Sequence, residues 1–415
     1  MTTNVFFFST VLAQERLSWI DHAFKFYYQK KQGERPSDTP ESEKRSDSTI
    51  FLTGDALYSL NEAESRNIWA SVLSLPQVKI ICDRDALEHR GISLEPLPER
   101  FMDQISTLPG DDQKGSPSFW TALISAARDR CRQHPPQIGW LQISSPYMFP
   151  SSEYGIRCLT TALNLGCGVS LYACLDGCHI FHTGQNPENR ENLGEATERL
   201  AKQAAEKNIP CTVTSSRYSA SARGYQSWDD GMGTIGSSFA IKSSHIRDVG
   251  VLIRQSRDVH LLLSENAGII YNASHDEVKD PYPGSPLLHD PAVVILITHS
   301  PYSTEYAYGA ISLAVACAHE GIPAHVIFLE EGIFVLTGEH RAPGESGAIT
   351  LPELISRLSG SENLQFFVLA SSLHKRGMVK NGTLAAVTEI GFDELGALLF
   401  APSDTGESSR RILFF

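Results

Sequence analysis

The sequence lacks the basic surface that nucleic-acid binding requires. Lysine and arginine total 35 residues against 48 aspartate and glutamate residues, so the formal net charge is −13. The short basic run KFYYQKK at 25–31 is followed by acidic residues, and no longer cluster occurs. Because phosphate neutralisation needs clustered Lys and Arg, we expect no direct nucleic-acid partner.

The sequence also lacks a long apolar run. The apolar start VFFFSTVLA (5–13) is too short to span a bilayer, and neither a basic segment nor a small-residue cleavage site accompanies it. We interpret it as a buried first strand, and we expect a cytoplasmic protein with no membrane partner.

Cysteine is sparse: eight residues at irregular spacing do not form a disulfide framework. They are either buried small hydrophobic residues or reactive thiols. No Ser-His-Asp arrangement has supporting local context, and we expect no organic cofactor.

What the sequence does contain is a pattern that occurs three times. A short apolar or β-branched run is followed by about nine residues that end in Arg-Gly. The glycines of this marker are Gly91, Gly224 and Gly377, which are 133 and 153 residues apart. This period is far longer than that of a solenoid repeat, so we predict three related domains in one chain. The repeats are VKIICDRDALEHRGI (78–92), CTVTSSRYSASARGY (211–225) and LQFFVLASSLHKRGM (364–378).

Apolar runs and helical periodicities alternate along the chain. The predicted strands are continuous apolar runs, which is typical of parallel sheets covered on both faces. We predict an α/β protein of three doubly wound domains with mostly parallel central sheets, whose ligands bind at the carboxyl ends of the strands. The predicted parts are a first domain (1–110), a linker helix region (111–136), a second domain (137–264), a linker (265–290) and a third domain (291–415). The predicted strands are 5–12, 49–53, 77–81, 138–144, 168–174, 210–216, 293–298, 325–330, 364–370 and 411–415; the predicted helices are 15–29, 61–73, 119–133, 152–165, 191–207, 304–320 and 351–358.

Cys82 is the strongest single candidate for chemistry. It ends an apolar strand and precedes a plausible short helix closed by Gly91. The amino end of a helix and Arg84 favour a thiolate, whereas Asp83 and Asp85 oppose it. The alternative is a buried, inert cysteine.

The other two copies have no cysteine at this place. Counting back from the glycine, the second copy offers Ser215 or Ser216, and the third offers Val368 or Leu369. A serine cannot carry a persulfide, and neither Val nor Leu has a nucleophile.

The segment YACLDGCHIFHTG holds Cys174, Cys178, His179 and His182. Two cysteines and two histidines suggest zinc, but only one segment contributes and no second cysteine pair exists. We therefore predict no metal site. Packing is the expected role of this segment; the alternative is that Cys178 or His182 lines a pocket.

With these motifs in view, the sequence resembles a known group of sulfur-relay proteins. The third domain resembles the DsrF/TusC family through SPY (300–302), EEGIF (330–334) and ASSLHKRGM (370–378). The second resembles the DsrE/TusD family through SPY (145–147), LDG (175–177) and SASARGY (219–225). The first is similar to the DsrH/TusB family through FLTGDALYSL (51–60) and CDRDALEHRGI (82–92).

The resemblance implies a function. In these families three small α/β subunits form a cytoplasmic heterohexamer, which passes persulfide sulfur from a donor protein to a small carrier protein of the TusE/DsrC type. The sulfur serves tRNA thiolation in one branch and sulfur oxidation in the other. This chain looks like a fusion of the three subunit types, so two copies would reproduce the hexamer, and we expect a homodimer.

The departure from the family is the missing cysteine of the second domain. The resemblance places the principal sulfur carrier before the Arg-Gly marker of the DsrE/TusD-like copy, which here has Ser215 or Ser216. We therefore predict a possible sulfurtransferase with a persulfide on Cys82. The predicted binding residues are Arg84, Arg90, Ser215, Ser216 and Cys178. The alternatives are a catalytically degenerate scaffold or binding protein, and a redox sensor that uses Cys174 and Cys178.

Overall fold

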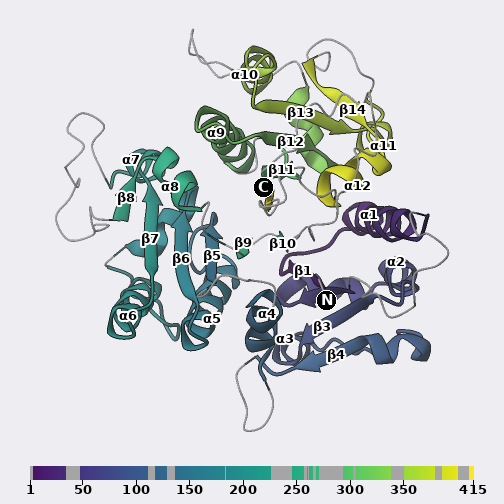
Figure 1. Cartoon of the computed structure of the whole chain (residues 1–415), viewed down its shortest axis with the longest axis horizontal. Helices are drawn as coiled ribbons and strands as arrows, with labels where there is room; N and C mark the ends of the chain where they lie inside the picture. Colours follow the sequence, from purple (N-terminus) through teal and green to yellow (C-terminus); the bar gives the residue numbers. More distant parts are fainter. Residues whose placement is uncertain are drawn as a thin grey trace.

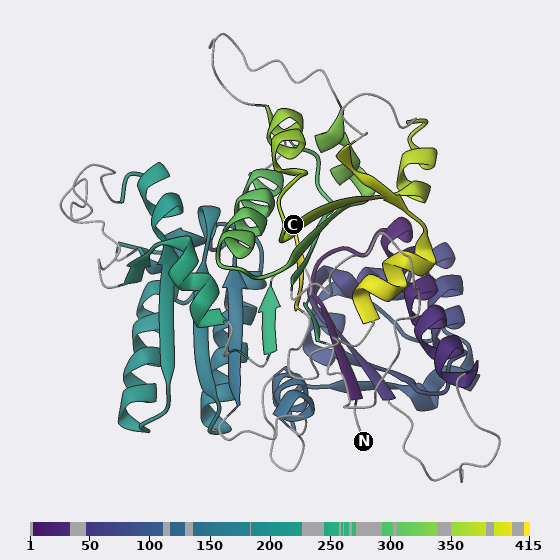
Figure 2. The same cartoon turned by 45° about the horizontal axis from the view of Figure 1, so that its top comes forward.

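The computed structural model has three lobes arranged around a common centre (Figures 1 and 2). Within the described part of the chain the strands form two sheets, one of ten strands and one of five. The described residues are 3–33, 47–110, 117–128, 136–182, 184–225, 245–256, 259, 261–264, 268–270, 293–301, 305–337, 350–378, 386–400 and 411–415.

The five-stranded sheet belongs to the second lobe and is parallel throughout. Its order is β8-β7-β6-β5-β9, so the chain starts near the middle and winds outward in both directions, as in doubly wound folds. The strands are β5 (Gln137–Gln142), β6 (Gly168–Ala173), β7 (Cys211–Ser216), β8 (Ile246–Arg247) and β9 (Leu261–Ser264); the helices are α5 (Ser151–Asn164), α6 (Leu193–Glu206), α7 (Arg217–Ala222) and α8 (Val249–Ser256).

The ten-stranded sheet joins the first and third lobes. Its order is β14-β13-β12-β11-β15-β10-β1-β2-β3-β4. Each half is parallel, and β10 (Gly268–Ile270) pairs antiparallel with both β1 and β15 at the seam. The predicted linker 265–290 therefore contains a strand, because the open edges of two sheets leave backbone groups that a third strand can pair.

The remaining elements surround these strands. In the first lobe they are β1 (Thr3–Phe8), α1 (Gln14–Gly33), β2 (Asp47–Leu52), α2 (Ala63–Leu73), β3 (Val78–Asp83), α3 (Arg84–Arg90) and β4 (Ile105–Leu108), followed by α4 (Phe119–Arg128). In the third lobe they are β11 (Val293–Ile297), α9 (Tyr306–His319), β12 (Ala324–Phe328), α10 (Leu351–Leu358), β13 (Leu364–Leu369), α11 (Ala370–Lys375), β14 (Thr388–Ile390), α12 (Phe392–Phe400) and β15 (Arg411–Phe414). Short 3-10 helices also occur: η1 (Gly54–Leu60), η2 (Glu99–Gln104), η3 (Leu175–Phe181) and η5 (Glu330–Leu336).

The α/β class with parallel strands flanked by helices is confirmed, and each predicted strand and helix has a counterpart within a few residues. The 3-10 helices and the short strands at the sheet edges were not predicted, since they carry too few residues for a periodic pattern. Predicted helix 119–133 ends at Arg128 within the described residues, and Cys131 lies outside them.

Each hydrophobic core is shared by two lobes. The side chains of β1 alternate between two cores: Phe6 and Phe8 join a core with the third lobe, whereas Val5 and Phe7 join a core with the second lobe. The third core combines residues of β5 and β6 with residues of β11 and β12. Since successive strand residues point to opposite faces, a first strand with apolar residues on both faces is covered by two different neighbours.

A buried ion pair also ties the first lobe to the third. Arg16 on α1 donates from Nε and Nη2 to the two carboxylate oxygens of Glu330, at 3.0 and 2.8 Å. The indole nitrogen of Trp19 donates to the same carboxylate at 3.3 Å. Both members of the pair are buried. Each charge has lost its hydration, and its attraction to the other charge is the main interaction that offsets this loss.

We predict that Glu330→Gln destabilises the protein strongly, because it leaves the Arg16 guanidinium buried without its counter-charge. The expected loss in free energy of unfolding is about 3–5 kcal/mol, measured by urea denaturation. Glu195→Gln is the control: that side chain is 71 % exposed in a surface pair with Arg199, and such a pair contributes about 0.5 kcal/mol. Equal effects of the two substitutions would contradict the prediction.

Candidate functional site

The arginine of each Arg-Gly marker occupies the same structural position in its lobe. Arg90, Arg223 and Arg376 lie at the carboxyl ends of α3, α7 and α11, and the following glycines adopt left-handed φ angles of 61, 75 and 64°. Glycine adopts this conformation without strain, so the marker ends a short helix and fixes the direction of its arginine.

Each of these arginines binds an acidic residue of its own lobe, at the start of the 3-10 helix that follows the second strand. The distances are 3.0 Å from Arg90 to Asp55, 2.6 Å from Arg223 to Asp176 and 2.8 Å from Arg376 to Glu331.

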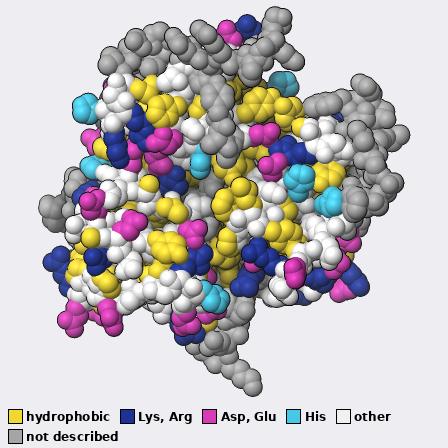
Figure 3. All heavy atoms as spheres, turned by 180° about the vertical axis from the view of Figure 1, so that it is seen from behind, with side chains coloured by type: hydrophobic (Ala, Val, Ile, Leu, Met, Phe, Trp, Pro, Cys, Tyr) yellow, Lys and Arg dark blue, Asp and Glu magenta, His cyan; other side chains and the backbone are white. Residues whose placement is uncertain are grey.

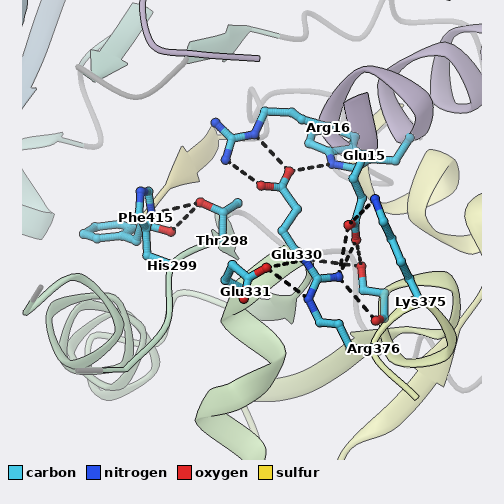
Figure 4. A network of polar contacts seen from close by, with 11 residues as sticks. Glu15, Arg16, Thr298, His299, Glu330, Glu331, Lys375, Arg376 and Phe415 are labelled. Carbon is cyan, nitrogen blue, oxygen red and sulfur yellow. Dashed lines mark hydrogen bonds and ion pairs between the residues drawn. The ribbon is translucent and has the colours of Figure 1, made fainter. Parts of the chain in front are cut away.

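The same arginines also reach the first helix of the next lobe. Arg90 forms a hydrogen bond with Tyr154 on α5. Arg223 binds Glu305, the residue before α9, at 2.6 Å. Arg376 binds Glu15 on α1 at 3.0 Å (Figure 4). The contacts run from lobe one to two, two to three and three to one, so they close a ring of head-to-tail interfaces. We call these three residues the ring arginines.

Glu15 is the most heavily bonded acid of the ring. It accepts hydrogen bonds from Ser372 at 2.6 Å and from Arg376, and Lys375 lies 3.3 Å away. Burial raises the pKa of this carboxyl, but the hydrogen bonds from Ser372 and Arg376 outweigh it, so the pKa is lowered overall. Glu15 therefore stays ionised in the folded protein at neutral pH.

The junction between the first and second lobes differs from the other two. Here the ring arginine meets a phenol, Tyr154, whose pKa is raised by burial. Behind it lies a buried carboxylate, Asp83, which accepts a hydrogen bond from Thr53 at 2.7 Å and from the backbone nitrogen of Ala86. Burial raises the pKa of Asp83 as well.

A cavity of about 570 Å³ lies where the three lobes meet. Residues that follow the first strand of each lobe line it, as predicted for ligand sites at the carboxyl ends of parallel strands. Arg90, Asp55 and Tyr154 line it too. Figure 3 shows one face of the molecule, where hydrophobic side chains gather near the middle among charged ones.

Three apolar residues at the cavity are unusually exposed. Val11, Met148 and Phe149 line it and have exposed fractions of 58, 65 and 46 %. Exposed apolar side chains that gather at a cavity are typical of binding surfaces. Of the five predicted binding residues, Arg90 is the one that lines this cavity.

Cys82 lies where the sequence predicts, at the carboxyl end of β3 and just before α3. Its environment differs from the expected one. The residue is fully buried within the core shared by the first and third lobes, and burial, followed by the charge of Asp83, raises the pKa of its thiol to about 12. Of the two alternatives for Cys82, this conformation favours the buried cysteine, because the loss of hydration outweighs the favourable effect of one short helix on the thiolate.

The structure defines which residues of the other two lobes are equivalent to Cys82. The residue just before the short helix is Asp83 in the first lobe, Ser216 in the second and Leu369 in the third. Ser215 and Val368 therefore correspond to Cys82. Ser215 is buried and its hydroxyl has no hydrogen-bond partner among the described residues, whereas the Ser216 hydroxyl caps α7 by accepting from the backbone nitrogen of Ser219.

The other predicted residues lie apart from the cavity. Arg84 sits 4.0 Å from Glu88 on the same exposed helix face. Cys178 is buried in the core between the first and second lobes, and burial raises its pKa to about 12. Cys178 therefore packs within this core in the described structure, and a binding role for it stays a prediction.

Four further cysteines also have raised thiol pKa values, and Cys317 is buried. Cys174 and Cys211 are partly exposed as residues, yet burial raises the pKa of their thiols to about 12 and 11. Burial also raises the thiol pKa of Cys158 and Cys167.

The histidines near Cys178 are engaged elsewhere. Nδ1 of His179 lies 2.6 Å from the hydroxyl of Tyr225. Across the described ranges, no three residues of the types that ligate metals come together.

Sequence reasoning missed the partners of the ring arginines. Asp55, Asp176 and Glu331 share one signal: each is the second residue of the 3-10 helix that follows the second strand of its copy. Tyr154 and Glu15 give no signal of their own, because an interface between distant segments leaves no local pattern.

We predict that the third-to-first junction weakens in acid. A carboxyl whose folded-state pKa is lowered stabilises the fold above its unfolded-state pKa, and this stabilisation is lost as the pH falls through the folded-state value. Glu15→Gln should therefore lower stability at pH 7 and flatten its pH dependence below about pH 4.5. Urea midpoints between pH 7 and pH 3 measure this, with Glu195→Gln as control. Parallel curves for Glu15→Gln and the unmodified protein would contradict the role given to Glu15.

Comparison with known proteins identifies one region of the chain. The model of the DsrE/DsrF-like family matches residues 292–403, which is most of the third lobe. No curated protein matches the chain. Within the described residues no helix is both long and apolar enough to cross a bilayer. The family match therefore applies to the third lobe, and the assignment of the first two lobes stays a prediction.

Proposed function

We propose that this protein is a sulfur-relay-related scaffold that binds partner proteins through its fused lobes, without sulfur transfer by Cys82 in this conformation. The observation that carries the proposal is the contrast between two features of the repeats. All three copies retain the ring arginine and its interface, whereas the Cys82 position is a buried thiol in one copy and Ser215 or Val368 in the others.

Persulfide exchange needs a thiolate that a donor can reach. With a pKa of about 12, Cys82 would be ionised in roughly one molecule in 10⁵ at pH 7. Its burial also blocks approach by a donor persulfide. Cys82 therefore meets neither requirement: its thiol is not ionised at neutral pH, and a donor cannot reach it.

The partners that we propose are those that the family resemblance implies: a sulfur-donor protein and a small carrier protein of the TusE/DsrC type. A homodimer of this chain would provide two copies of each surface. In this proposal the fused lobes position the donor protein and the carrier protein next to each other, and the sulfur chemistry takes place on these partners.

The second candidate function is sulfur transfer by Cys82 itself. Its position at a strand's carboxyl end and next to a helix start favours this candidate. The transfer would require an opening of the first lobe that exposes the thiol, since the closed conformation buries it.

Intact-mass spectrometry after incubation with a persulfide donor separates the two functions. We expect no added sulfur on the native protein, and addition to several cysteines in urea, where the thiols are exposed. Cys82→Ser and Cys211→Ser are the matched variants, because Cys211 is one of the partly exposed described thiols. One sulfur on native protein that disappears in Cys82→Ser but persists in Cys211→Ser would overturn the scaffold function in favour of transfer.

Binding of a carrier protein tests the scaffold directly. We expect a TusE/DsrC-type carrier to bind the unmodified protein and Cys82→Ser with the same affinity in calorimetry, because Cys82 is buried and contributes to no surface. No binding to either protein would contradict the scaffold function, whatever the result of the labelling.

A further inference from the structure

The ring arginines differ in how many carboxylates they bind. Arg223 binds two, Asp176 and Glu305. Arg376 likewise binds two, Glu331 and Glu15. Among the described residues Arg90 binds one, Asp55, through a single oxygen that accepts from both Nε and Nη2 at 3.1 and 3.0 Å.

The missing carboxylate corresponds to a definite place in the second lobe. Glu305 is the residue before α9, and the residue before α5 is Pro150. Glu15 is the second residue of α1, and the second residue of α5 is Ser152. The first-to-second junction therefore has Tyr154 but no acid on α5 at either position.

The cavity opens at this same place. Pro150, Tyr154, Asp55 and Arg90 all line it. The third nitrogen of the guanidinium, Nη1, forms a long bond of 3.4 Å to the carbonyl oxygen of Ala86 on its own helix, as Nη1 of Arg223 does to the carbonyl oxygen of Ser219. A guanidinium can donate five hydrogen bonds and binds carboxylates in a planar fork. The difference between the ring arginines is therefore the second carboxylate, which Arg223 and Arg376 have and which Tyr154 replaces at Arg90.

We propose that the junction cavity binds a small amphipathic carboxylic acid, whose carboxylate takes at Arg90 the place that a glutamate takes at Arg223 and Arg376. This site goes beyond the scaffold function, and it does not depend on whether sulfur passes through Cys82.

The rest of the cavity fits the apolar part of such a ligand. Its volume of about 570 Å³ lies inside the range of roughly 300–1,000 Å³ that small-molecule sites occupy. Val11, Met148 and Phe149 provide exposed apolar surface at the cavity. A flexible methionine and an aromatic ring accommodate alkyl or aryl groups of varied shape.

The other charges at the cavity do not compete for the ligand. Arg16 lines the cavity but is held by both oxygens of Glu330. Asp176 and Glu305 also line it, and each of them is paired with Arg223. Arg90 is therefore the cation of the lining that a ligand carboxylate can approach.

Isothermal titration of the full chain with three matched probes tests the charge requirement. The probes are 3-phenylpropionate, its neutral amide 3-phenylpropionamide, and the cation 2-phenylethylamine. We expect the carboxylate to bind at least about tenfold more tightly than either of the others, as a charge-assisted bond to arginine implies. Equal binding of the amide, or tighter binding of the amine, would overturn the proposal.

Two ring-arginine variants locate the site. Arg90→Gln should weaken 3-phenylpropionate by at least about tenfold. Arg376→Gln removes an equivalent ring contact outside the cavity lining and should leave the affinity unchanged. Equal loss in both variants, each shown to be folded by circular dichroism, would mean that the ring supports the fold and that Arg90 holds no ligand.

A third variant supplies the missing acid from the chain itself. Pro150→Glu places a carboxylate at the position that Glu305 has before α9. We expect it to abolish binding of 3-phenylpropionate while the urea midpoint stays the same or rises. Unchanged binding in Pro150→Glu would contradict the proposed position of the carboxylate.

A carboxylate can also come from the end of a polypeptide, and one further probe distinguishes this source. Acetyl-Gly-Phe with a free carboxylate presents the same phenyl and carboxylate groups on a peptide backbone. We expect it to bind no more tightly than 3-phenylpropionate. Tighter binding by tenfold would reassign the cavity to a chain end and overturn the small-molecule ligand.

Discussion

The burial of each first strand on both faces, by two different neighbours, is the constraint on which the structure depends. On β1, Phe6 and Phe7 point to opposite faces and are both fully buried, one in the core shared with the third lobe and the other in the core shared with the second. Removing either neighbour would expose a row of large apolar side chains to water. The lobes therefore depend on one another for the burial of their first strands. Fusion into one chain keeps the two neighbours of each first strand covalently linked to it.

The polar ring follows from this arrangement. Because the three first strands converge, their carboxyl ends and the starts of the following helices meet at one place, where backbone groups and charged side chains cannot be covered by apolar ones. The ring arginines satisfy this junction by bridging the acid of one lobe to the first helix of the next. Close packing fixes the geometry behind them: a Cβ on Gly332 would lie 1.9 Å from the carbonyl oxygen of Ile297. Gly332 in the EEG turn therefore allows the 3-10 helix to pack closely against the end of the first strand of the third lobe.

The sequence was sufficient to predict the repeats, the α/β class and nearly every long element. Those features depend on local periodicity and on copies that can be compared within the chain. It was insufficient for the state of Cys82, because the thiol's pKa depends on its burial in a core that segments distant in the chain build together. The strand β10 and the partners Tyr154 and Glu15 were missed for the same reason: each is defined by a segment far away in the chain.

A comparison of the three copies also shows which positions of the repeat can hold different residues in the same fold. At the Cys82 position a thiol, a hydroxyl and a branched hydrocarbon all occupy the same buried place, and the Ser215 hydroxyl has no hydrogen-bond partner among the described residues. A site that accepts such different groups is governed by volume. The ring position holds arginine in all three copies. Arg223 and Arg376 each provide the counter-charge for acids of two lobes. Arg90 pairs with Asp55 of its own lobe, and the next lobe places Tyr154 beside it where the other junctions have an acid. That asymmetry leaves Arg90 with one carboxylate partner among the described residues at the cavity, and this is the physical basis for expecting a ligand carboxylate there.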